Sequence, residues 1–168
     1  MKKLSNQLKP KVKNIYRIID KPQKQRFDNY CQNHNIQKIK MLWHGSRNEN
    51  MFSIISTRLK LRPNARITGK MFGQGIYFAP SSMKNFNYTS YRGTTWGNGS
   101  SDTAYMALYA TAYGEPLNVT QSRSYTQAEL NLLHKNCVHA HAGAQLRNDE
   151  IVFYNEDAML LMYLVEFE

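Results

Sequence analysis

The sequence predicts an α+β fold in which split, mostly antiparallel β-sheets carry a few short helices. Stretches with the apolar pattern of strands outnumber helical stretches, and they follow one another without regular strand–helix alternation. The helical stretches are also short. With 168 residues, 42% of them hydrophobic, the chain is long enough for one domain with its own core.

The first third of the chain predicts two strands around one helix. Residues 12–18 alternate between apolar and polar side chains, as expected for a half-buried strand. Asp20 and Pro22 are typical of a helix start, and residues 33–35 end that helix. Residues 39–44 predict a second strand, which ends at Gly45. The apolar stripe of the helix consists of Phe27, Tyr30 and Cys31.

The rest of the chain predicts short elements joined by polar loops. The apolar run 103–112 is expected to be a buried strand, which 117–119 continues after a break at Gly114. The other expected elements are a helix at 50–57 that carries Phe52, Ile54 and Ile55, a loop at 62–70, a strand at 76–79, one or two helical turns at 81–88, a loop at 91–102, a helix from about Gln127, and strands at 150–154 and 160–167.

The composition argues against a secreted, a membrane-spanning and a disulfide-rich protein. The start of the chain lacks the apolar segment of a secretory signal, and no apolar run is long enough to cross a bilayer. Two cysteines are too few for a disulfide framework, which favours a reducing, intracellular setting and no membrane partner.

The positive charge is concentrated near the N-terminus. Residues 1–47 hold twelve Lys and Arg against Asp20 and Asp28, a net charge of +10, whereas residues 48–168 are neutral overall. We interpret residues 1–11 as a basic tail and residues 12–168 as the folded domain. The basic segment is either a surface for nucleic acid or another anionic polymer, or a solvated face without a partner.

Three short segments combine residues suited to holding a nucleotide. Residues 42–47 read Leu-Trp-His-Gly-Ser-Arg, and Gly45 there lets a ligand lie against the backbone. Residues 69–79 read Gly-Lys-Met-Phe-Gly-Gln-Gly-Ile-Tyr-Phe-Ala, a glycine-rich turn that matches neither the Walker nor the Rossmann pattern. In residues 148–154, Glu150 heads an apolar strand. Taken singly, each segment also fits a purely structural role.

Together and in this order, the three segments resemble the catalytic domain of the poly(ADP-ribose) polymerase family, which has a diphtheria-toxin-like fold. The resemblance runs from about Val12 to Phe167, and Tyr163-Leu164 follows Glu150 at the expected remove. It implies an NAD-dependent ADP-ribosyltransferase that cleaves the nicotinamide–ribose bond of NAD. The transferred ADP-ribose would go to a macromolecular acceptor, with protein as the first expectation and chain elongation left open. NAD is then the donor substrate, and no metal is implied.

The resemblance also implies roles for single residues. His44, Tyr77 and Glu150 match the catalytic triad, in which His44 hydrogen-bonds the adenosine ribose. Gly45 is expected to pair with the nicotinamide carboxamide through its backbone, and Tyr88 to stack on the nicotinamide ring. Residues 62–70 correspond to the loop over the donor site. Further expected NAD contacts are Ser46, Arg47, Gly69, Phe78, Ala79, Lys84 and Asn85.

The sequence departs from the family pattern in two ways. Asn85 stands where the family usually has a serine that donates to the nicotinamide carboxamide; an amide can also donate, with different geometry. The helical regulatory domain that precedes the catalytic region in several family members has no counterpart in the roughly 40 residues before His44.

Other interpretations of the chain stay open at this level. Cys137, His139 and His141 alternate as metal ligands on one strand face would, but a fourth ligand is not evident, so we expect no metal. The loop 91–102 is either an acceptor-recognition loop or a variable insertion. The rival functions are ADP-ribosylation of nucleic acid, a silent module that binds NAD or ADP-ribose, and a basic nucleic-acid-binding domain that only shares the fold.

Overall fold

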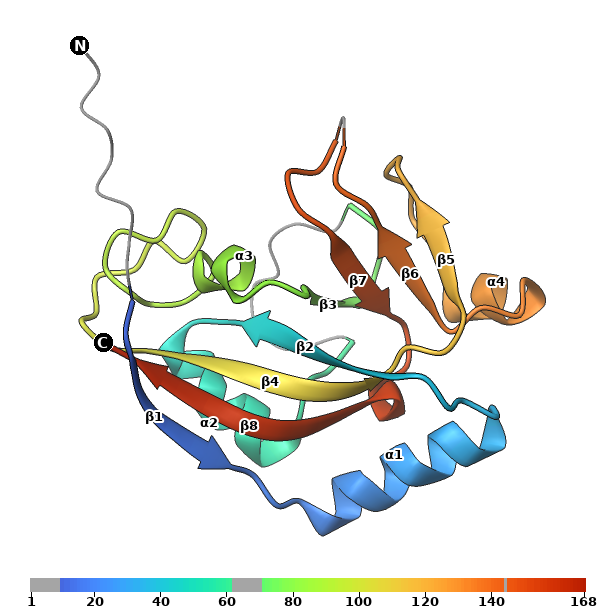
Figure 1. The fold of residues 1–168 in the computed structure, drawn as a ribbon, viewed down its shortest axis with the longest axis horizontal. Coiled ribbons are helices and arrows are strands. Elements are labelled where there is room, and N and C mark those ends of the chain that lie inside the picture. Colours follow the sequence, from blue (N-terminus) through green and yellow to red (C-terminus); the bar gives the residue numbers. More distant parts are fainter. Residues whose placement is uncertain (1–9, 62–70, 144) are drawn as a thin grey trace.

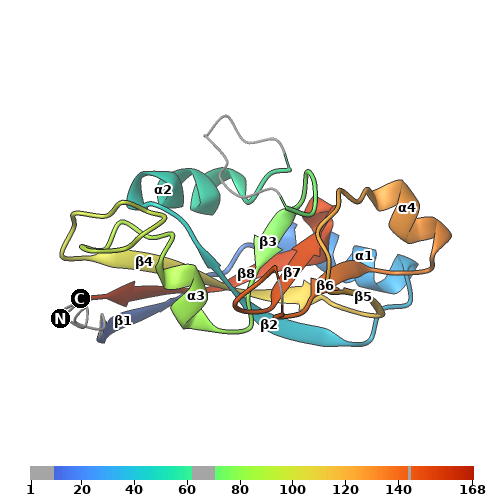
Figure 2. The same ribbon diagram turned by 90° about the horizontal axis from the view of Figure 1, so that it is seen from above.

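Two four-stranded sheets lie next to each other in the computed structural model, which describes residues 10–61, 71–143 and 145–168 (Figures 1 and 2). The first sheet has the order β1-β8-β4-β2, and each neighbouring pair is antiparallel. Its strands are β1 (Val12–Arg17), β2 (Ile39–Gly45), β4 (Ala104–Ala112) and β8 (Met159–Phe167).

The second sheet has the order β3-β7-β6-β5. Its strands are β3 (Ile76–Phe78), β5 (Pro116–Val119), β6 (Cys137–Ala140) and β7 (Glu150–Phe153). Only the β5–β6 pair is parallel. The predicted α+β class with split, mostly antiparallel sheets is therefore confirmed.

A short backbone bridge joins the two sheets. Trp43 N donates to the Ala79 carbonyl over 2.9 Å, and Ala79 N donates to the Trp43 carbonyl over 3.1 Å. The aromatic core continues across the same junction, because Phe78 of β3 contacts Tyr109 of β4 and Phe153 of β7, with ring centroids 5.4 and 5.7 Å apart. The C-terminal end of β2 is thereby fixed against the end of β3.

The helices are short and lie around the sheets (Figure 1). They are α1 (Lys21–Asn33), α2 (Asn48–Thr57), α3 (Ser82–Phe86), α4 (Gln127–Leu132) and the single 3₁₀ turn η1 (Glu156–Ala158). Asp20 caps α1 as predicted, since its Oδ1 accepts from Gln23 N over 2.8 Å. Phe27 and Tyr30 are buried beneath the first sheet. No helix among the described residues has the length and apolarity needed to cross a membrane.

Two expectations about these elements are wrong. Strand β1 is exposed at every residue, because it is an edge strand of the first sheet. Residues 116–119 do not continue β4; they form β5 in the second sheet, where they pair with β6. In α2 the buried residues are Met51 and Ile54, whereas Phe52 is 80% exposed. The predicted basic tail falls largely on residues 1–9, which lie outside the described residues.

Candidate active site

His44 lies next to the last residue of β2, at the junction of the two sheets. Its Nδ1–H donates to the Tyr77 carbonyl over 2.9 Å, which leaves Nε2 with a lone pair. The ring also packs 5.6 Å from Phe78. Burial lowers the pKa of His44, and the hydrogen bond to Tyr77 offsets this only in part. His44 is therefore neutral near pH 7 and presents a hydrogen-bond acceptor at Nε2.

Gly45 packs directly against the backbone of α3. A Cβ placed on Gly45 would lie 2.0 Å from the Asn85 carbonyl oxygen, so any side chain at this position would force the strand and helix apart. Asn85 is buried, and its Nδ2 donates to the Trp43 carbonyl, which also accepts from Ala79 N. The amide of Asn85 thus ties α3 to the end of β2 and keeps a second N–H proton.

Tyr77 is held inside the glycine-rich turn that precedes β3. Its hydroxyl accepts from Phe72 N over 3.0 Å and donates to the Gly73 carbonyl over 2.9 Å. Gly73 has φ +90°, a left-handed conformation that favours glycine. Burial raises the pKa of Tyr77 to about 12. Because the hydroxyl is engaged on both sides, the ring is the part of Tyr77 that a ligand can use.

Glu150 begins β7 and is paired with a lysine from α3. Its Oε1 lies 2.7 Å from Lys84 Nζ, and the two side chains are only 13% and 12% exposed. Lys84 also donates to the Asn148 and Asp149 carbonyls over 3.1 and 3.3 Å. The sequence predicted a place for Lys84 in the donor site but not this ion pair, which forms only when β7 aligns beside α3.

Tyr77 and Glu150 share one face of the second sheet. Tyr77 pairs with Val152, and Glu150 lies two residues before Val152 on the same strand. Side chains two residues apart on a strand point to the same face. After burial, the negative charge of Glu150 is a further cause that raises the pKa values of Tyr77 and Tyr88. The carboxylate is therefore within electrostatic reach of both rings.

The remaining predicted contacts surround this centre to different degrees. Tyr88 is half-buried and stacks on Trp96 of the loop 91–102, with centroids 6.5 Å apart. Ser46 accepts from Asn50 over 3.0 Å, and Arg47 is exposed and 3.6 Å from Glu49. Phe78 and Ala79 are buried, so their side chains belong to the core beneath the candidate site and are not available to a ligand. Gly69 and the loop 62–70 lie outside the described residues.

The geometry combines a neutral histidine, an aromatic ring held by its hydroxyl and a carboxylate near two tyrosines. Backbone at Gly45 completes one side without a side chain. This set of groups at the junction of two mostly antiparallel sheets is the one that the sequence led us to expect for an ADP-ribosyltransferase. A surface hollow of about 770 Å³ between the ends of α1 and α4 contains none of the predicted site residues.

Comparison with known proteins gives the same class. Residues 1–140 match the poly(ADP-ribose) polymerase catalytic domain. The chain is 28% identical over 159 residues to a protein of Invertebrate iridescent virus 6 named putative poly [ADP-ribose] polymerase-like 100L, covering 90% of this chain and 83% of that one. It is 34% identical over 119 residues to poly [ADP-ribose] polymerase of Sarcophaga peregrina, covering 69% of this chain and 11% of that one.

The chain belongs to the poly(ADP-ribose) polymerase catalytic domain family, whose members are NAD-dependent ADP-ribosyltransferases. Poly [ADP-ribose] polymerase 1 of Gallus gallus is 46% identical over 79 residues, which cover 46% of this chain but 8% of that protein. The chain thus spans most of the viral relative and a small part of the animal polymerases.

Proposed function

We propose that this chain transfers ADP-ribose from NAD to a protein acceptor at a site centred on His44, Tyr77 and Glu150. The observation that carries the proposal is the position of Glu150 on the sheet face that Tyr77 occupies, with His44 bonded to the Tyr77 carbonyl. Glu150 lies beyond the span that matches the family domain, so its role rests on this register.

The reaction requires groups that hold the nicotinamide and a negative charge near the ribose. It does not depend on a general acid that protonates the leaving group. Nicotinamide is cationic in NAD and leaves as a neutral molecule, while the ribose passes through an oxocarbenium-like state, as in glycosyl transfer. In the proposed site, the Gly45 backbone and the Asn85 amide hold the carboxamide, and the rings of Tyr77 and Tyr88 enclose the nicotinamide. His44 Nε2 accepts from a hydroxyl of the adenosine ribose.

In the proposed site, Glu150 has the catalytic role. Its carboxylate stabilises positive charge on the ribose and orients or deprotonates the acceptor. Lys84, 2.7 Å away, fixes the position of the carboxylate through a largely buried ion pair. Because the pair is formed before any donor arrives, little reorganisation is needed when charge develops.

A protein acceptor is favoured by the distribution of basic residues in the described part of the chain. Lys13 and Arg17 lie on β1 and Lys40 lies on β2, at opposite edges of the first sheet. Lys13 pairs with Glu166 over 3.1 Å, and Lys40 lies 3.8 Å from the ring centre of Tyr113. Among the described residues, this division and partial pairing of the charges argues against a continuous basic surface for nucleic acid.

We place the reaction inside the cell. Cys31 and Cys137 are both free, and a structure that uses no disulfide suits a reducing compartment. NAD as donor fits the same setting.

The acceptor class is tested with NAD labelled in its adenylate part. Purified chain is incubated with a mixed protein and nucleic-acid extract. One portion of the labelled macromolecules is then digested with protease and another with nuclease. We expect protease to release the label from the macromolecules and nuclease to leave it attached. Label released by nuclease alone would replace protein with nucleic acid as the acceptor. Absence of label from a folded chain that binds NAD would make the chain a binding module.

A further inference from the structure

We propose that His139, His141 and Asp149 form a binding site for a divalent transition-metal ion, with zinc as the expected occupant. One ligand atom from each residue lies within 4.8 Å of the other two. The sequence alone predicted no metal, because no fourth ligand was evident beside Cys137, His139 and His141. In the structure the third group is instead Asp149, which precedes Glu150.

Strand pairing explains why the three side chains meet. His139 lies on β6, and His141 follows two residues later on the same face, with its N–H still donating to the Val119 carbonyl over 2.9 Å. Because β6 and β7 are antiparallel and Ala140 pairs with Glu150, the chain brings Asp149 back beside both rings. Cys137 is fully buried, and its Sγ donates to the Tyr113 carbonyl over 3.4 Å.

The spacing of the ligand atoms suits a tetrahedral ion. Asp149 Oδ2 lies 3.0 Å from His139 Nε2 and 3.6 Å from His141 Nδ1. Metal–ligand bonds of about 2.0–2.1 Å at tetrahedral angles separate ligand atoms by about 3.3 Å. The two distances from Asp149 Oδ2 are within a few tenths of an ångström of that spacing, and the two ring nitrogens, within 4.8 Å of each other, would draw together around the ion.

Each ligand is oriented by a partner on its other polar atom. His139 Nδ1 is 2.6 Å from the Tyr113 hydroxyl, and Asp149 Oδ1 accepts from Ala142 N over 2.8 Å. His141 Nε2 donates to Asn118 Oδ1 over 2.8 Å. Such outer partners fix ring orientation and tautomer in metal sites.

The hydrogen bond of His141 leaves Nδ1 facing Asp149, where a proton or a metal ion can lie between the two side chains. With its proton on Nε2, the ring presents the lone pair of Nδ1 towards Asp149 Oδ2, which also carries only lone pairs. Two acceptors that face each other repel unless positive charge lies between them. Imidazole and carboxylate ligands together suit zinc and related divalent ions.

The site is open enough to load an ion. His141 and Asp149 side chains are 41% and 33% exposed, while His139 is 11% exposed. His141 also borders a surface hollow of about 430 Å³. Three protein ligands leave a fourth position for water. A bound ion would tie the end of β6 to Asp149, whose carbonyl accepts from Lys84 in the proposed active site.

The test uses the whole chain stripped with a chelator and then freed of it. Zn²⁺ is titrated against a chromophoric chelator, and Co²⁺ replaces it to report the ligand field in the visible spectrum. We expect one Zn²⁺ per chain, a rise in Tm on binding and the Co²⁺ spectrum of a four-coordinate site. His141→Gln and Asp149→Asn should weaken Zn²⁺ binding more than about 100-fold, and Asn118→Leu about 10- to 100-fold.

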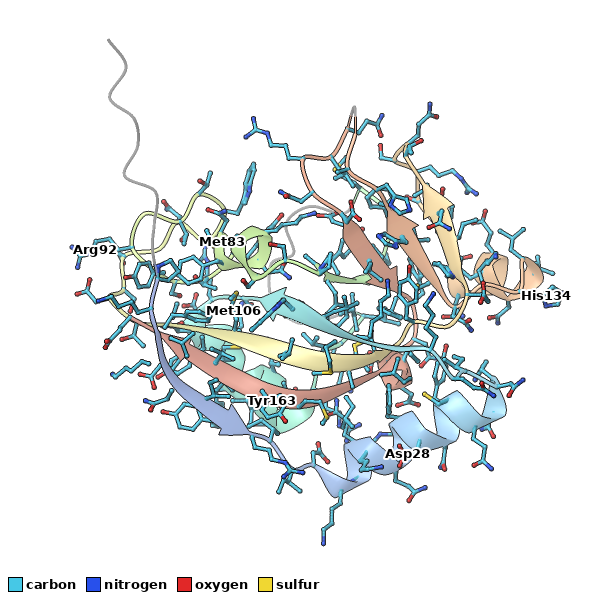
Figure 3. The ribbon with its side chains drawn as sticks, viewed as in Figure 1. Asp28, Met83, Arg92, Met106, His134 and Tyr163 are labelled. Atoms are coloured by element: carbon cyan, nitrogen blue, oxygen red, sulfur yellow. The ribbon has the colours of Figure 1, made fainter. Side chains whose placement is uncertain are left out.

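His134→Asn is the matched control. His134 follows α4 and precedes β6, so it lies away from the cluster at the other end of that strand (Figure 3). Its φ of 53° is one that asparagine also adopts readily. This variant should bind Zn²⁺ like the unaltered chain. Folded chain that takes up no stoichiometric Zn²⁺, or that binds it equally after His141→Gln and Asp149→Asn, would overturn the proposal. Neither readout depends on transferase activity, so the metal site and the proposed function can fail separately.

Discussion

Gly45 and Asn85 form the tightest contact of the candidate site. The carbonyl of Asn85 occupies the space where a Cβ on residue 45 would lie, at 2.0 Å. Backbone groups of β2 and α3 can approach this closely only because residue 45 has no side chain. The half-buried peptide of Gly45 is the group that the proposed nicotinamide contact uses.

Gly45→Ala is therefore expected to destabilise the fold and to abolish NAD binding. The added methyl must push α3 away from β2, which costs about 1–3 kcal/mol of unfolding free energy. Chemical denaturation and NAD titration measure the two effects. Gly143→Ala is the matched control, because a Cβ at Gly143 meets nothing within 4 Å. Unchanged NAD affinity in Gly45→Ala would contradict the proposed backbone contact.

His44 gives the site a pH dependence whose sign can be stated. Burial holds its pKa below the ordinary 6.5, so below that pH the unfolded chain binds a proton that the folded chain does not. The free energy of unfolding should fall as pH decreases from about 6.5. Denaturation at several pH values should give a smaller decrease for His44→Gln than for the unaltered chain. His139, whose pKa burial also lowers, contributes equally to both proteins and cancels. Equal slopes would show that His44 titrates normally.

The sequence predicts single residues of the candidate site where they belong to a short, recognisable motif. His44 and Gly45 come from one such motif, and Tyr77 from another. Partners from distant segments could not be predicted, since Lys84 and Glu150 meet only through the register of β3 and β7. Asp149 was missed as a partner of the two histidines for the same reason, since the register of β6 and β7 brings it to them.

Besides its backbone pairing with β8, strand β1 is attached to the first sheet through one carboxylate. Glu166 of β8 accepts from Asn14 and Tyr16 over 2.8 Å each, and Lys13 pairs with it over 3.1 Å. These three contacts, with the hydrogen bond from Asn14 as the largest cause, lower the pKa of Glu166 to about 2. All three partners lie on β1, so this carboxylate compensates for the apolar contact that an exposed edge strand lacks.

Glu166→Gln is expected to loosen β1 without unfolding the rest of the chain. Amide hydrogen exchange should accelerate in residues 12–17 and stay unchanged in β2 and β4. In the unaltered chain the same loosening should appear as pH falls from about 4.5 towards 2, because a carboxylate with a lowered folded pKa loses its contribution there. Glu168→Gln, at the exposed chain end, serves as the control. Unaltered exchange in residues 12–17 would show that backbone pairing alone holds β1.

Elements with a strong local signal were predicted closely, and those defined by pairing were not. The cap at Asp20 and the stripe of Phe27 and Tyr30 locate α1 within the sequence itself. By contrast, residues 116–119 have a strand pattern that does not say which sheet they join. Figure 3 shows Met106 and Tyr163 on neighbouring strands β4 and β8, a pairing that joins residues far apart in the chain.

At the scale of the whole molecule, the proposed active site lies where two small sheets meet at one bridge. Trp43 and Ala79 join the end of β2 to the end of β3, and α3 closes the junction from the side through Asn85 and Lys84. His44 reaches the site from the first sheet, while Tyr77 and Glu150 reach it from the second. The fold class was predictable from the pattern of elements, but this meeting point was predictable only from the family resemblance.

The most direct test of the account is nicotinamide release in a single turnover, together with NAD affinity, for the unaltered chain and for Glu150→Gln. Glutamine keeps the size of the side chain and removes its charge, so we expect release to slow by about 10²- to 10⁴-fold while NAD affinity changes little. Glu129→Gln, which alters an exposed ion pair with Arg123, should match the unaltered chain. Equal losses of release and affinity in Glu150→Gln, or release at the full rate, would contradict the central claim that Glu150 acts on the bond being broken.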